Sequence, residues 1–338
     1  MQSQHWLLPR LVYFLIAASL GMYSLFFLVA ERAGPVLLNF QPAWAAGSGE
    51  GEKAMQATWD QIGSLPELQG GDDEHIAICA AIKEQQEDMV EWLVHHYHHM
   101  GVKRFYIMDD GSKPPLATFD YPGIPRSALT FTYQPRQDRD RHMQLVFYRW
   151  CLDRWRDRHT WIAFIDADEF LYTPGPETFP EILASFEGND TVGALGVSWQ
   201  AHTSNGLLER PDSVRKAFTE CVANNGGGSQ GTINRHVKSV VKTAFGVKPY
   251  QHPHAFQLRN GSKTVGEDGQ PITGGAFRNS MTRDRVGLAH YVMKSRAEYI
   301  EKSYRGTGQS NFKDDAFWDA IEKHTNHTTC TDLVGYDP

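Results

Sequence analysis

Three carboxylates follow an apolar segment near the middle of the chain. In WIAFIDADEF (161–170), five aromatic or aliphatic residues lead directly into Asp166, Asp168 and Glu169. Carboxylates crowded at the end of a buried strand repel one another and lose hydration, so something must compensate them. One compensation is a divalent cation, because Mn²⁺ and Mg²⁺ favour oxygen ligands. The simpler alternative is a solvated acidic turn, since short acidic motifs recur by chance.

The geometry of the strand end decides what these carboxylates can reach. If the strand stays extended, alternation puts Asp166 and Asp168 on the same side of the backbone. Both could then bind one metal, or one could accept from a ribose hydroxyl while the other holds the metal. We therefore ask which elements would position this strand end.

The preceding residues predict a strand–helix–strand unit. HIAICAAI (75–82) has strand character, and 84–100 carries acidic residues in its first turn, histidines in its last turn and apolar residues at helical spacing. KRFYIMD then predicts a second strand that ends at Asp109 and Asp110. A βαβ unit of this size pairs its strands in parallel, and such sheets bind nucleotides beyond the carboxyl ends of their strands.

A second cycle brings the acidic segment to the same edge. Residues 130–136 predict a strand, 138–159 an amphipathic helix, and 161–170 the next strand. The carboxylates after that strand are thus expected beside Asp109 and Asp110. The glycine-rich segment 223–234 predicts a surface loop.

Composition excludes some classes of partner and site. The 338 residues are 41% hydrophobic and 22% charged, with a net charge of −7, so a nucleic-acid partner is not expected. The four cysteines stand far apart without a CxxC pair, which argues against structural zinc and leaves one or two disulfides possible in an oxidising compartment.

The N-terminus predicts a membrane anchor. Residues 11–30 contain no charged side chain, and twenty helical residues span about 30 Å, enough to cross a bilayer core. We expect a short cytosolic tail (1–10), a transmembrane signal anchor (11–30) and a flexible stem (31–74). Sequons at Asn189, Asn260 and Asn326 favour a lumenal main domain, hence a single-pass type II protein.

Three segments, in the same order, carry a family resemblance. AIKEQQEDMVEWLVHHYHHMGVKRFYIMDDGS (81–112) resembles the opening of the nucleotide-binding half of a GT-A glycosyltransferase, and WIAFIDADEFL is similar to that superfamily's DxD segment. LAHYVMKSRAEYIEKSYRG (288–306) resembles the closing segment of glycosyltransferase family 92 and its family-2-like relatives. The resemblance implies a mixed, mainly parallel α/β sheet flanked by helices at 75–310, followed by a C-terminal extension (311–338).

The resemblance also implies a set of site residues. Asp166 and Asp168 match the pair that holds Mn²⁺ (or Mg²⁺) against the donor's diphosphate and contacts its ribose, and His290 matches a histidine that completes the metal shell. Asp110 matches the acidic residue near the uracil and ribose, with Lys83 and Glu84 beside it. Lys294 and Arg305 would face the diphosphate.

The resemblance further implies a Golgi enzyme that transfers a sugar, with galactose a plausible one, from a UDP-sugar to a glycan or glycoconjugate, with inversion. Nothing in the C-terminal GYDP separates the Golgi from the endoplasmic reticulum. Inversion requires a carboxylate base, and the sequence does not choose among Glu209, Asp212, Glu267 and Asp268. DDGSKPP also lacks the further Asp that the family more often has after the Ser, which leaves the ribose contacts open.

Two other functions fit parts of the pattern. A haloacid-dehalogenase-like phosphatase also has an aspartate pair after an apolar strand, but it needs Thr or Val where this chain has Phe170. A membrane-tethered sugar-binding protein without turnover would not require Asp166, Asp168 and His290 together.

Several aromatic residues have competing interpretations. The run HHYHH (95–99) could place at most two histidines in one site, and its position at a helix end favours a structural role over zinc. His252 and His254 fit a surface turn better than an acceptor cleft. Trp199 suits sugar recognition or the core equally well.

Overall fold

The computed structural model describes residues 75–136, 142–224, 233–306 and 314–337. The predicted tail (1–10), anchor (11–30) and stem (31–74) lie outside these residues, as does most of the glycine-rich segment 223–234. Among the helices of the described residues, none combines the length and the apolar character that a bilayer crossing requires.

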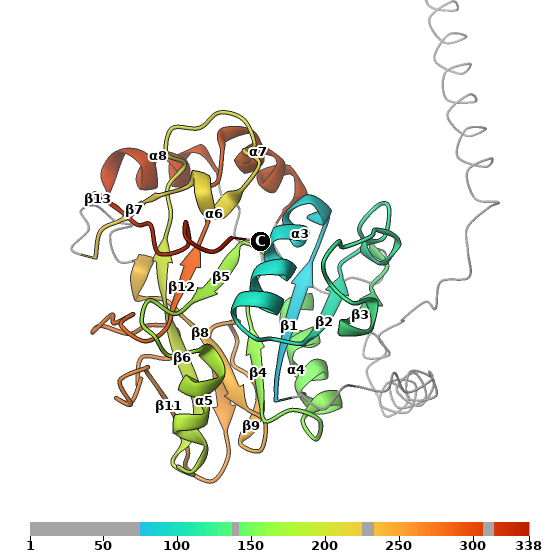
Figure 1. Ribbon diagram of the computed structural model, residues 1–338, viewed down its shortest axis with the longest axis vertical. Coiled ribbons are helices and arrows are strands. Elements are labelled where there is room, and N and C mark those ends of the chain that lie inside the picture. The colour runs from blue at the N-terminus through green and yellow to red at the C-terminus, as the bar shows by residue number, and fades with distance from the viewer. Residues whose placement is uncertain (1–74, 137–141, 225–232, 307–313, 338) are drawn as a thin grey trace, which may run out of the picture. The chain divides into compact units, whose positions relative to one another are not determined.

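A nine-stranded mixed sheet organises the fold (Figure 1). Its strands are β1 (Ile76–Ile82), β2 (Arg104–Asp109), β3 (Leu129–Tyr133), β4 (Trp161–Phe164), β5 (Glu169–Tyr172), β6 (Val192–Ala201), β8 (Val237–Lys242), β11 (Lys263–Val265) and β12 (Gly287–His290). The order is β3-β2-β1-β4-β8-β6-β12-β5, with β11 paired to β6.

The first four strands of that order run parallel. β1 pairs in parallel with both β2 and β4, and β2 pairs in parallel with β3. The predicted βαβ unit is therefore confirmed, with α3 (Gln86–Val94) as its helix. The carboxyl ends of β1, β2 and β4 meet at one edge of the sheet, as expected from the sequence.

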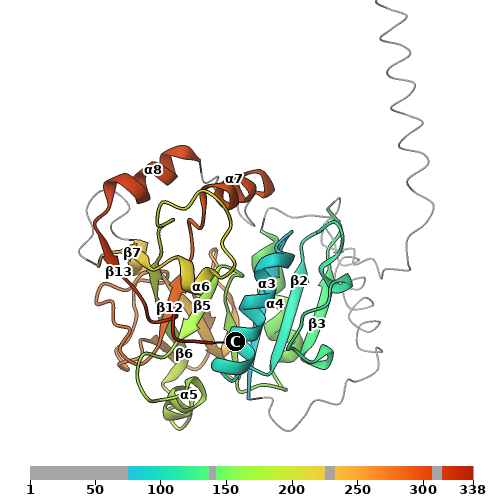
Figure 2. The same cartoon turned by 45° about the horizontal axis from the view of Figure 1, so that its top comes forward.

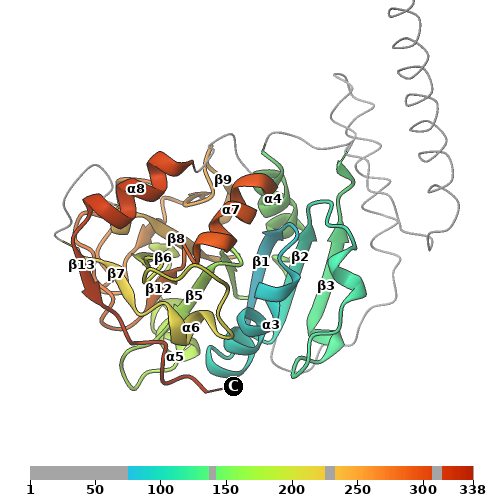
Figure 3. The same ribbon diagram turned by 90° about the horizontal axis from the view of Figure 1, so that it is seen from above.

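Helices cover both faces of β1, as alternation along the strand requires. Ile76, Ile78, Ala80 and Ile82 pack in one core cluster with Met89, Trp92 and Leu93 of α3. Ala77 and Cys79 pack in a second cluster with α4 (Met143–Trp155), and Figure 3 shows both helices beside the strand. The helix predicted over 138–159 begins at Met143 and ends at Trp155, so within the described residues it is shorter than expected at both ends.

The histidines of HHYHH connect α3 to β5. They form a π-helix at His95–His99, and the rings of His95 and His96 are buried. His95 Nε2 lies 2.6 Å from the carbonyl oxygen of Leu171, whose backbone N–H donates to His96 Nε2 at 3.2 Å. His96 Nδ1 lies 2.8 Å from the Trp92 carbonyl oxygen. These contacts give the two rings the structural role that their position favours.

The other half of the sheet is mixed in direction. β8 runs antiparallel to both β4 and β6, while β12 is parallel to β6 and antiparallel to β5. The remaining elements are α5 (Phe179–Glu187), α6 (Val214–Ala217), α7 (Arg296–Arg305), α8 (Asp315–His324), β7 (Glu220–Val222), β9 (Gly246–Pro249), β10 (Phe256–Leu258) and β13 (His327–Thr329).

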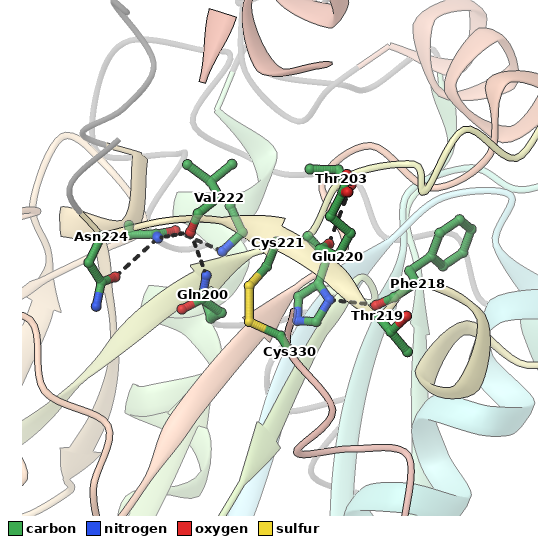
Figure 4. Close-up of a disulfide and its surroundings, with 12 residues drawn as sticks. Gln200, Thr203, Phe218, Thr219, Glu220, Cys221, Val222, Asn224 and Cys330 are labelled. Atoms are coloured by element: carbon green, nitrogen blue, oxygen red, sulfur yellow. Dashed lines mark hydrogen bonds between the residues drawn. A yellow bond between two sulfur atoms is a disulfide. The ribbon is translucent and has the colours of Figure 1, made fainter. Parts of the chain in front are cut away.

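Disulfides join segments that are far apart in the sequence. Cys79 of β1 is bonded to Cys151 of α4, and Cys221 of β7 to Cys330, which follows β13. β13 pairs antiparallel with β7, so the second bond fixes the C-terminal residues to the domain (Figure 4). α7, α8 and β13 follow one another over this region (Figure 2), and Ile321 of α8 is fully buried.

The buried His96 ring makes folding sensitive to acid. Burial lowers the pKa of His96 to about 3, from an ordinary value of 6.5. The unfolded chain therefore binds a proton between pH 6.5 and 3 that the folded chain does not, so this contribution to stability is present above pH 6.5 and is lost as the pH falls.

In the wild type, the free energy of unfolding falls as the pH is lowered from 6.5 to 4. We predict that this fall is smaller by about 3 kcal/mol in His96→Gln. Denaturant unfolding at a series of pH values measures this dependence. His98→Gln, which removes an exposed histidine of the same segment, keeps the wild-type dependence. An unchanged pH dependence in His96→Gln would contradict the prediction.

Candidate active site

The chain turns sharply after β4. That strand ends at Phe164, residues 167 and 168 form a turn, and the backbone N–H of Glu169 donates to the carbonyl oxygen of Asp166 at 3.1 Å. β5 then begins at Glu169. The expectation of an extended strand through Asp168 is therefore wrong. The turn lets the buried Glu169 enter a new strand, and it directs Asp166 and Asp168 to different partners.

The carboxylate of Asp166 is held by β8 and α4. Lys238 Nζ lies 2.9 Å from Asp166 Oδ2. Oδ1 accepts from Gln144 Nε2 at 2.5 Å and from the Tyr148 hydroxyl at 3.2 Å. Burial disfavours the Lys238 ammonium, but the carboxylates of Asp166 and Glu169 outweigh that effect and raise its pKa. Lys238, only 1% exposed, is thus a charged side chain fixed by its anionic neighbours.

Glu169 shares the same lysine. Its Oε2 lies 3.4 Å from Lys238 Nζ and accepts the backbone N–H of Asp166 at 2.8 Å. Burial raises the pKa of the Glu169 carboxyl well above its ordinary value; the charge of Lys238 opposes that shift, and the neighbouring carboxylates of Asp166 and Asp168 add to it. The acidic segment is therefore stabilised by a buried lysine from another strand.

Asp168 faces β12 and α7 instead. Its Oδ2 lies 2.5 Å from Lys302 Nζ and 3.6 Å from His290 Nε2. Asp168 and His290 are both buried, and the backbone N–H of Tyr291 donates to the Asp168 carbonyl oxygen at 2.9 Å. The strand end after β4 and the strand end of β12 thus meet at one point.

Two of the three predicted metal ligands lie together. Asp168 and His290 offer an oxygen and an imidazole nitrogen, a donor set that suits Mn²⁺. Each aspartate also pairs with a lysine, Asp166 with Lys238 and Asp168 with Lys302. Across the described ranges, no three His, Cys, Asp or Glu side chains are grouped to hold a metal ion. Asp168 and His290 therefore lie together as two candidate ligands.

The ends of β1 and α7 form the neighbouring part of the site. Lys83 Nζ donates to the carbonyl oxygen of Arg305 at 2.5 Å, and Arg305 Nη1 donates to the carbonyl oxygen of Glu84 at 3.4 Å. Burial lowers the pKa of Arg305, while the carboxylates of Asp88, Asp168, Glu301 and Glu84 oppose that shift. Arg305 therefore lies within the electrostatic reach of Asp168.

Asp110 directly follows β2 at the same edge of the sheet. It is 5% exposed, and its backbone N–H donates to the carbonyl oxygen of Ile82 at 2.8 Å. The backbone N–H of Glu84 donates to Ser112 Oγ at 2.8 Å, which joins the two strand ends. The structure thus brings Lys83, Glu84, Asp110 and Arg305 to the sheet edge that also carries Asp166, Asp168 and His290.

Lys294 is compensated within the protein. Its Nζ lies 2.7 Å from Asp88 Oδ1, which also accepts from Arg210 Nη1 at 2.7 Å. Although burial alone would raise the pKa of Asp88, Lys294 and Arg210 lower it to about 2. Lys294 therefore pairs with an acid of α3, and its contact with a diphosphate stays a prediction.

Backbone strain coincides with this region. Glu84 has a φ of 50° and Lys294 a φ of 54°. Side chains other than Gly, Asn and Asp rarely adopt this left-handed conformation, and where they do, the strain is often found at functional sites. Glu84 lies two residues after the end of β1, and Lys294 lies four residues after the end of β12. Both strained residues therefore lie close to strand ends at this edge of the sheet.

The four candidate bases divide into two classes. The Glu267 carboxylate accepts the backbone N–H groups of residues 284–286 at 2.6–2.8 Å, and Asp268 Oδ2 lies 2.6 Å from Arg278 Nη2. These contacts engage the carboxylates of Glu267 and Asp268, and the catalytic role considered for them stays a prediction. Glu209 and Asp212 are exposed between β6 and α6.

Lys238 and Lys302 were not foreseen from the sequence. VKSVVK (237–242) places a lysine within a strand whose six residues are all buried, a signal for a compensated charge. Lys302 lies inside the segment that carries the family resemblance, in EYIEKSYRG. Only the fold reveals that both lysines reach the acidic segment.

We predict that Lys238→Met lowers the free energy of unfolding at pH 7 by about 3 kcal/mol or more, because Asp166 and Glu169 lose the buried cation that both contact. Denaturant unfolding at pH 7 measures it.

Two further variants control for that result. Lys242→Met removes a buried lysine of the same strand that donates to the Glu187 carbonyl oxygen, and it costs less. The double variant Lys238→Met/Glu169→Gln recovers part of the loss. Equal losses for Lys238→Met and Lys242→Met would refute the assigned role.

Comparison with known proteins identifies the family. The family model for glycosyltransferase family 92 matches residues 75–244. A family 92 protein of Oryza sativa subsp. japonica is 25% identical over 56% of this chain and 31% of its own length. A galactan β-1,4-galactosyltransferase of Arabidopsis thaliana is 28% identical over 64% of this chain and 40% of its own length.

The extent of these matches is limited. The chain spans about a third of the length of the curated relatives it matches. The crystal structure of the galactosyltransferase LgtC with donor and acceptor sugar analogues covers 38% of this chain and 46% of its own, with 13% identity and a TM-score of 0.21. The family model nevertheless covers half of the chain, including the carboxylates after β4, and the chain belongs to glycosyltransferase family 92.

Proposed function

We propose that the chain transfers a sugar, galactose being the first candidate, from a UDP-sugar to a glycan acceptor. Membership of glycosyltransferase family 92 supports glycosyl transfer as the class of reaction, and the Arabidopsis relatives named as galactan β-1,4-galactosyltransferases support the choice of sugar. That membership leaves the phosphatase alternative without support. The observation that carries the proposal is the meeting of Asp168, His290 and Lys302 at the edge where β1 and β2 also end.

Each part of this edge has a proposed task. Asp110 and Glu84 would accept hydrogen bonds from the nucleoside of the donor, and Asp168 with His290 would hold Mn²⁺ or Mg²⁺. When bound there, the metal would supply positive charge against the diphosphate. Lys302, Arg305 and Lys83 add positive charge from the chain itself, which stabilises the leaving group.

The reaction is a substitution at the anomeric carbon. A hydroxyl of the acceptor forms the new C–O bond, the bond to the diphosphate oxygen breaks, and its electron pair leaves with UDP. The hydroxyl proton passes to a carboxylate base, as inversion requires. Of the four candidates, Glu209 and Asp212 have carboxylates that no contact among the described residues engages.

We predict that nucleotide release from one UDP-sugar is metal-dependent. The detergent-solubilised full chain is assayed with UDP- and GDP-sugars, with Mn²⁺ and with EDTA. Asp168→Asn reduces release by about 100-fold or more, because it removes the charge that faces His290 and Lys302. Asp120→Asn, which changes an exposed aspartate between β2 and β3, keeps wild-type release.

Two results would count against this function. A folded chain that neither binds nor cleaves any nucleotide sugar in the presence of Mn²⁺ would exclude it. Binding of a sugar without nucleotide release, with glycan acceptors present, would favour the sugar-binding protein without turnover.

We further propose that the domain is lumenal, in a single-pass type II protein of the Golgi. Two disulfides support an oxidising compartment, and Asn189, Asn260 and Asn326 are all exposed in their sequons. Residues 11–30 would be the anchor.

We predict that the chain expressed in a eukaryotic secretory pathway carries N-glycans at these three positions. Peptide-N-glycosidase treatment increases its electrophoretic mobility, and each Asn→Gln substitution removes one step of that shift, because each side chain is accessible on the surface. Identical mobility before and after treatment would argue against a lumenal domain.

A further inference from the structure

A row of aromatic rings leads away from His290. The ring centroids of His290 and Trp199 are 4.1 Å apart, and those of Trp199 and His236 are 4.7 Å apart with an interplanar angle of 27°. His236 in turn contacts Phe277 at 4.5 Å. We call these four residues the ring row. It is continuous, and its inner end adjoins Asp168 through His290.

The ring row opens from the interior to the surface. Trp199 is 7% exposed and Phe277 is 44% exposed, with the half-buried His236 between them. His254 flanks the row, 5.2 Å from Trp199 and 5.1 Å from His236. Aromatic side chains are enriched in binding interfaces relative to the rest of the surface.

A cavity adjoins the outer end. It has a volume of about 430 Å³, within the usual range for ligand sites, and its lining includes Phe277, Arg235, Asp268, Gln270 and Arg278. Arg278 is neutralised by Asp268 at 2.6 Å. The cavity therefore combines one exposed ring with hydrogen-bonding groups, which is the combination that a sugar needs for its apolar face and its hydroxyls.

An unsatisfied donor lies within the row. The indole Nε1 of Trp199 is buried and has no hydrogen-bond partner among the described residues. A buried donor without a partner costs free energy, so such groups in native proteins are commonly satisfied by water or ligand. A hydroxyl entering beside His290 would satisfy it.

Two observations favour an uncharged ligand: the Arg278 guanidinium at the cavity is paired with Asp268 at 2.6 Å, and the histidines that flank the ring row are partly buried. Burial lowers the pKa of His254 well below its ordinary value, with Lys238 and His236 adding to the effect, and burial also lowers the pKa of His252. These rings are thus uncharged at neutral pH. Uncharged rings offer stacking surfaces without selecting an anionic sugar.

We propose that the cavity at the outer end of the ring row is the acceptor subsite, and that it takes a neutral oligosaccharide that stacks a pyranose ring on Phe277 and extends toward His290. This inference rests on the proposed function and adds to it the acceptor's chemical class and its path. The donor occupies the edge near β1 and β2, and the acceptor approaches Asp168 and His290 from β6 and β8.

Phe277→Ala tests the proposal at its exposed end, where truncation spares the core. With β-1,4-linked galactotetraose as acceptor, we expect the KM for the acceptor to rise about threefold to tenfold, the range of one lost aromatic contact. The kcat and the nucleotide release without acceptor stay within about twofold. Phe277→Trp, which keeps a ring, retains the wild-type KM, and Val90→Ala on α3 serves as an exposed control.

Binding is measured separately by saturation-transfer NMR with galactotetraose in the absence of donor. Loss of the transfer signal in Phe277→Ala, with the wild-type and Phe277→Trp signals intact, supports the subsite even if the chain transfers nothing. If the chain cleaves no nucleotide sugar but shows this pattern, the proposed function is wrong, and the ring row still binds sugar.

Three results would overturn the inference. They are an unchanged acceptor KM and binding signal in Phe277→Ala, the absence of any galactotetraose signal in the wild type, and tighter binding of an oligogalacturonate than of galactotetraose. In each case the metal-dependent release of nucleotide could still be observed, so the two hypotheses fail separately.

Discussion

Asp166, Asp168 and Glu169 place three carboxylates within four consecutive positions after a buried strand, and two lysines reach them. Lys238 arrives on β8 and Lys302 on α7. Without those cations, burial would make the charged forms of the acids unfavourable, and the segment would have to neutralise or move into solvent. The turn at 167–168 divides the acids between the two lysines, and so it creates two environments within one short segment.

This charge compensation depends on the order of the strands. β8 lies between β4 and β6 and runs antiparallel to both, so its amino-terminal end stands beside the carboxyl end of β4. A parallel strand in that place would have put Lys238 at the opposite edge. β12 is parallel to β6 and therefore delivers His290 to the same edge. The change from parallel to mixed pairing beyond β4 is thus what makes the site possible.

The sequence predicted the parallel half of the fold better than the mixed half, for physical reasons. β1, α3 and β2 are close in sequence and show clear periodicity, so their pairing and the edge that carries Asp110 and Asp166 could be inferred. The contacts of Lys238 with Asp166 join residues 72 positions apart, and those of Lys302 with Asp168 join residues 134 apart. No local pattern encodes such distant partners. The turn after Phe164 was missed because WIAFIDADEF reads equally well as one strand.

The same constraint explains why the ring row and the acidic segment lie so close together. His236 and Lys238 are two residues apart at the start of β8, and residues two apart in an extended chain face the same side of the sheet. The backbone N–H of Trp199 donates to the carbonyl oxygen of His236 at 3.0 Å, which sets the indole of β6 next to that imidazole. One strand in one register therefore positions both Lys238, which pairs with Asp166, and His236, whose ring stacks on Trp199. A shift of β8 by a single residue would turn both side chains to the other face, and it would remove the counter-charge and the ring row together.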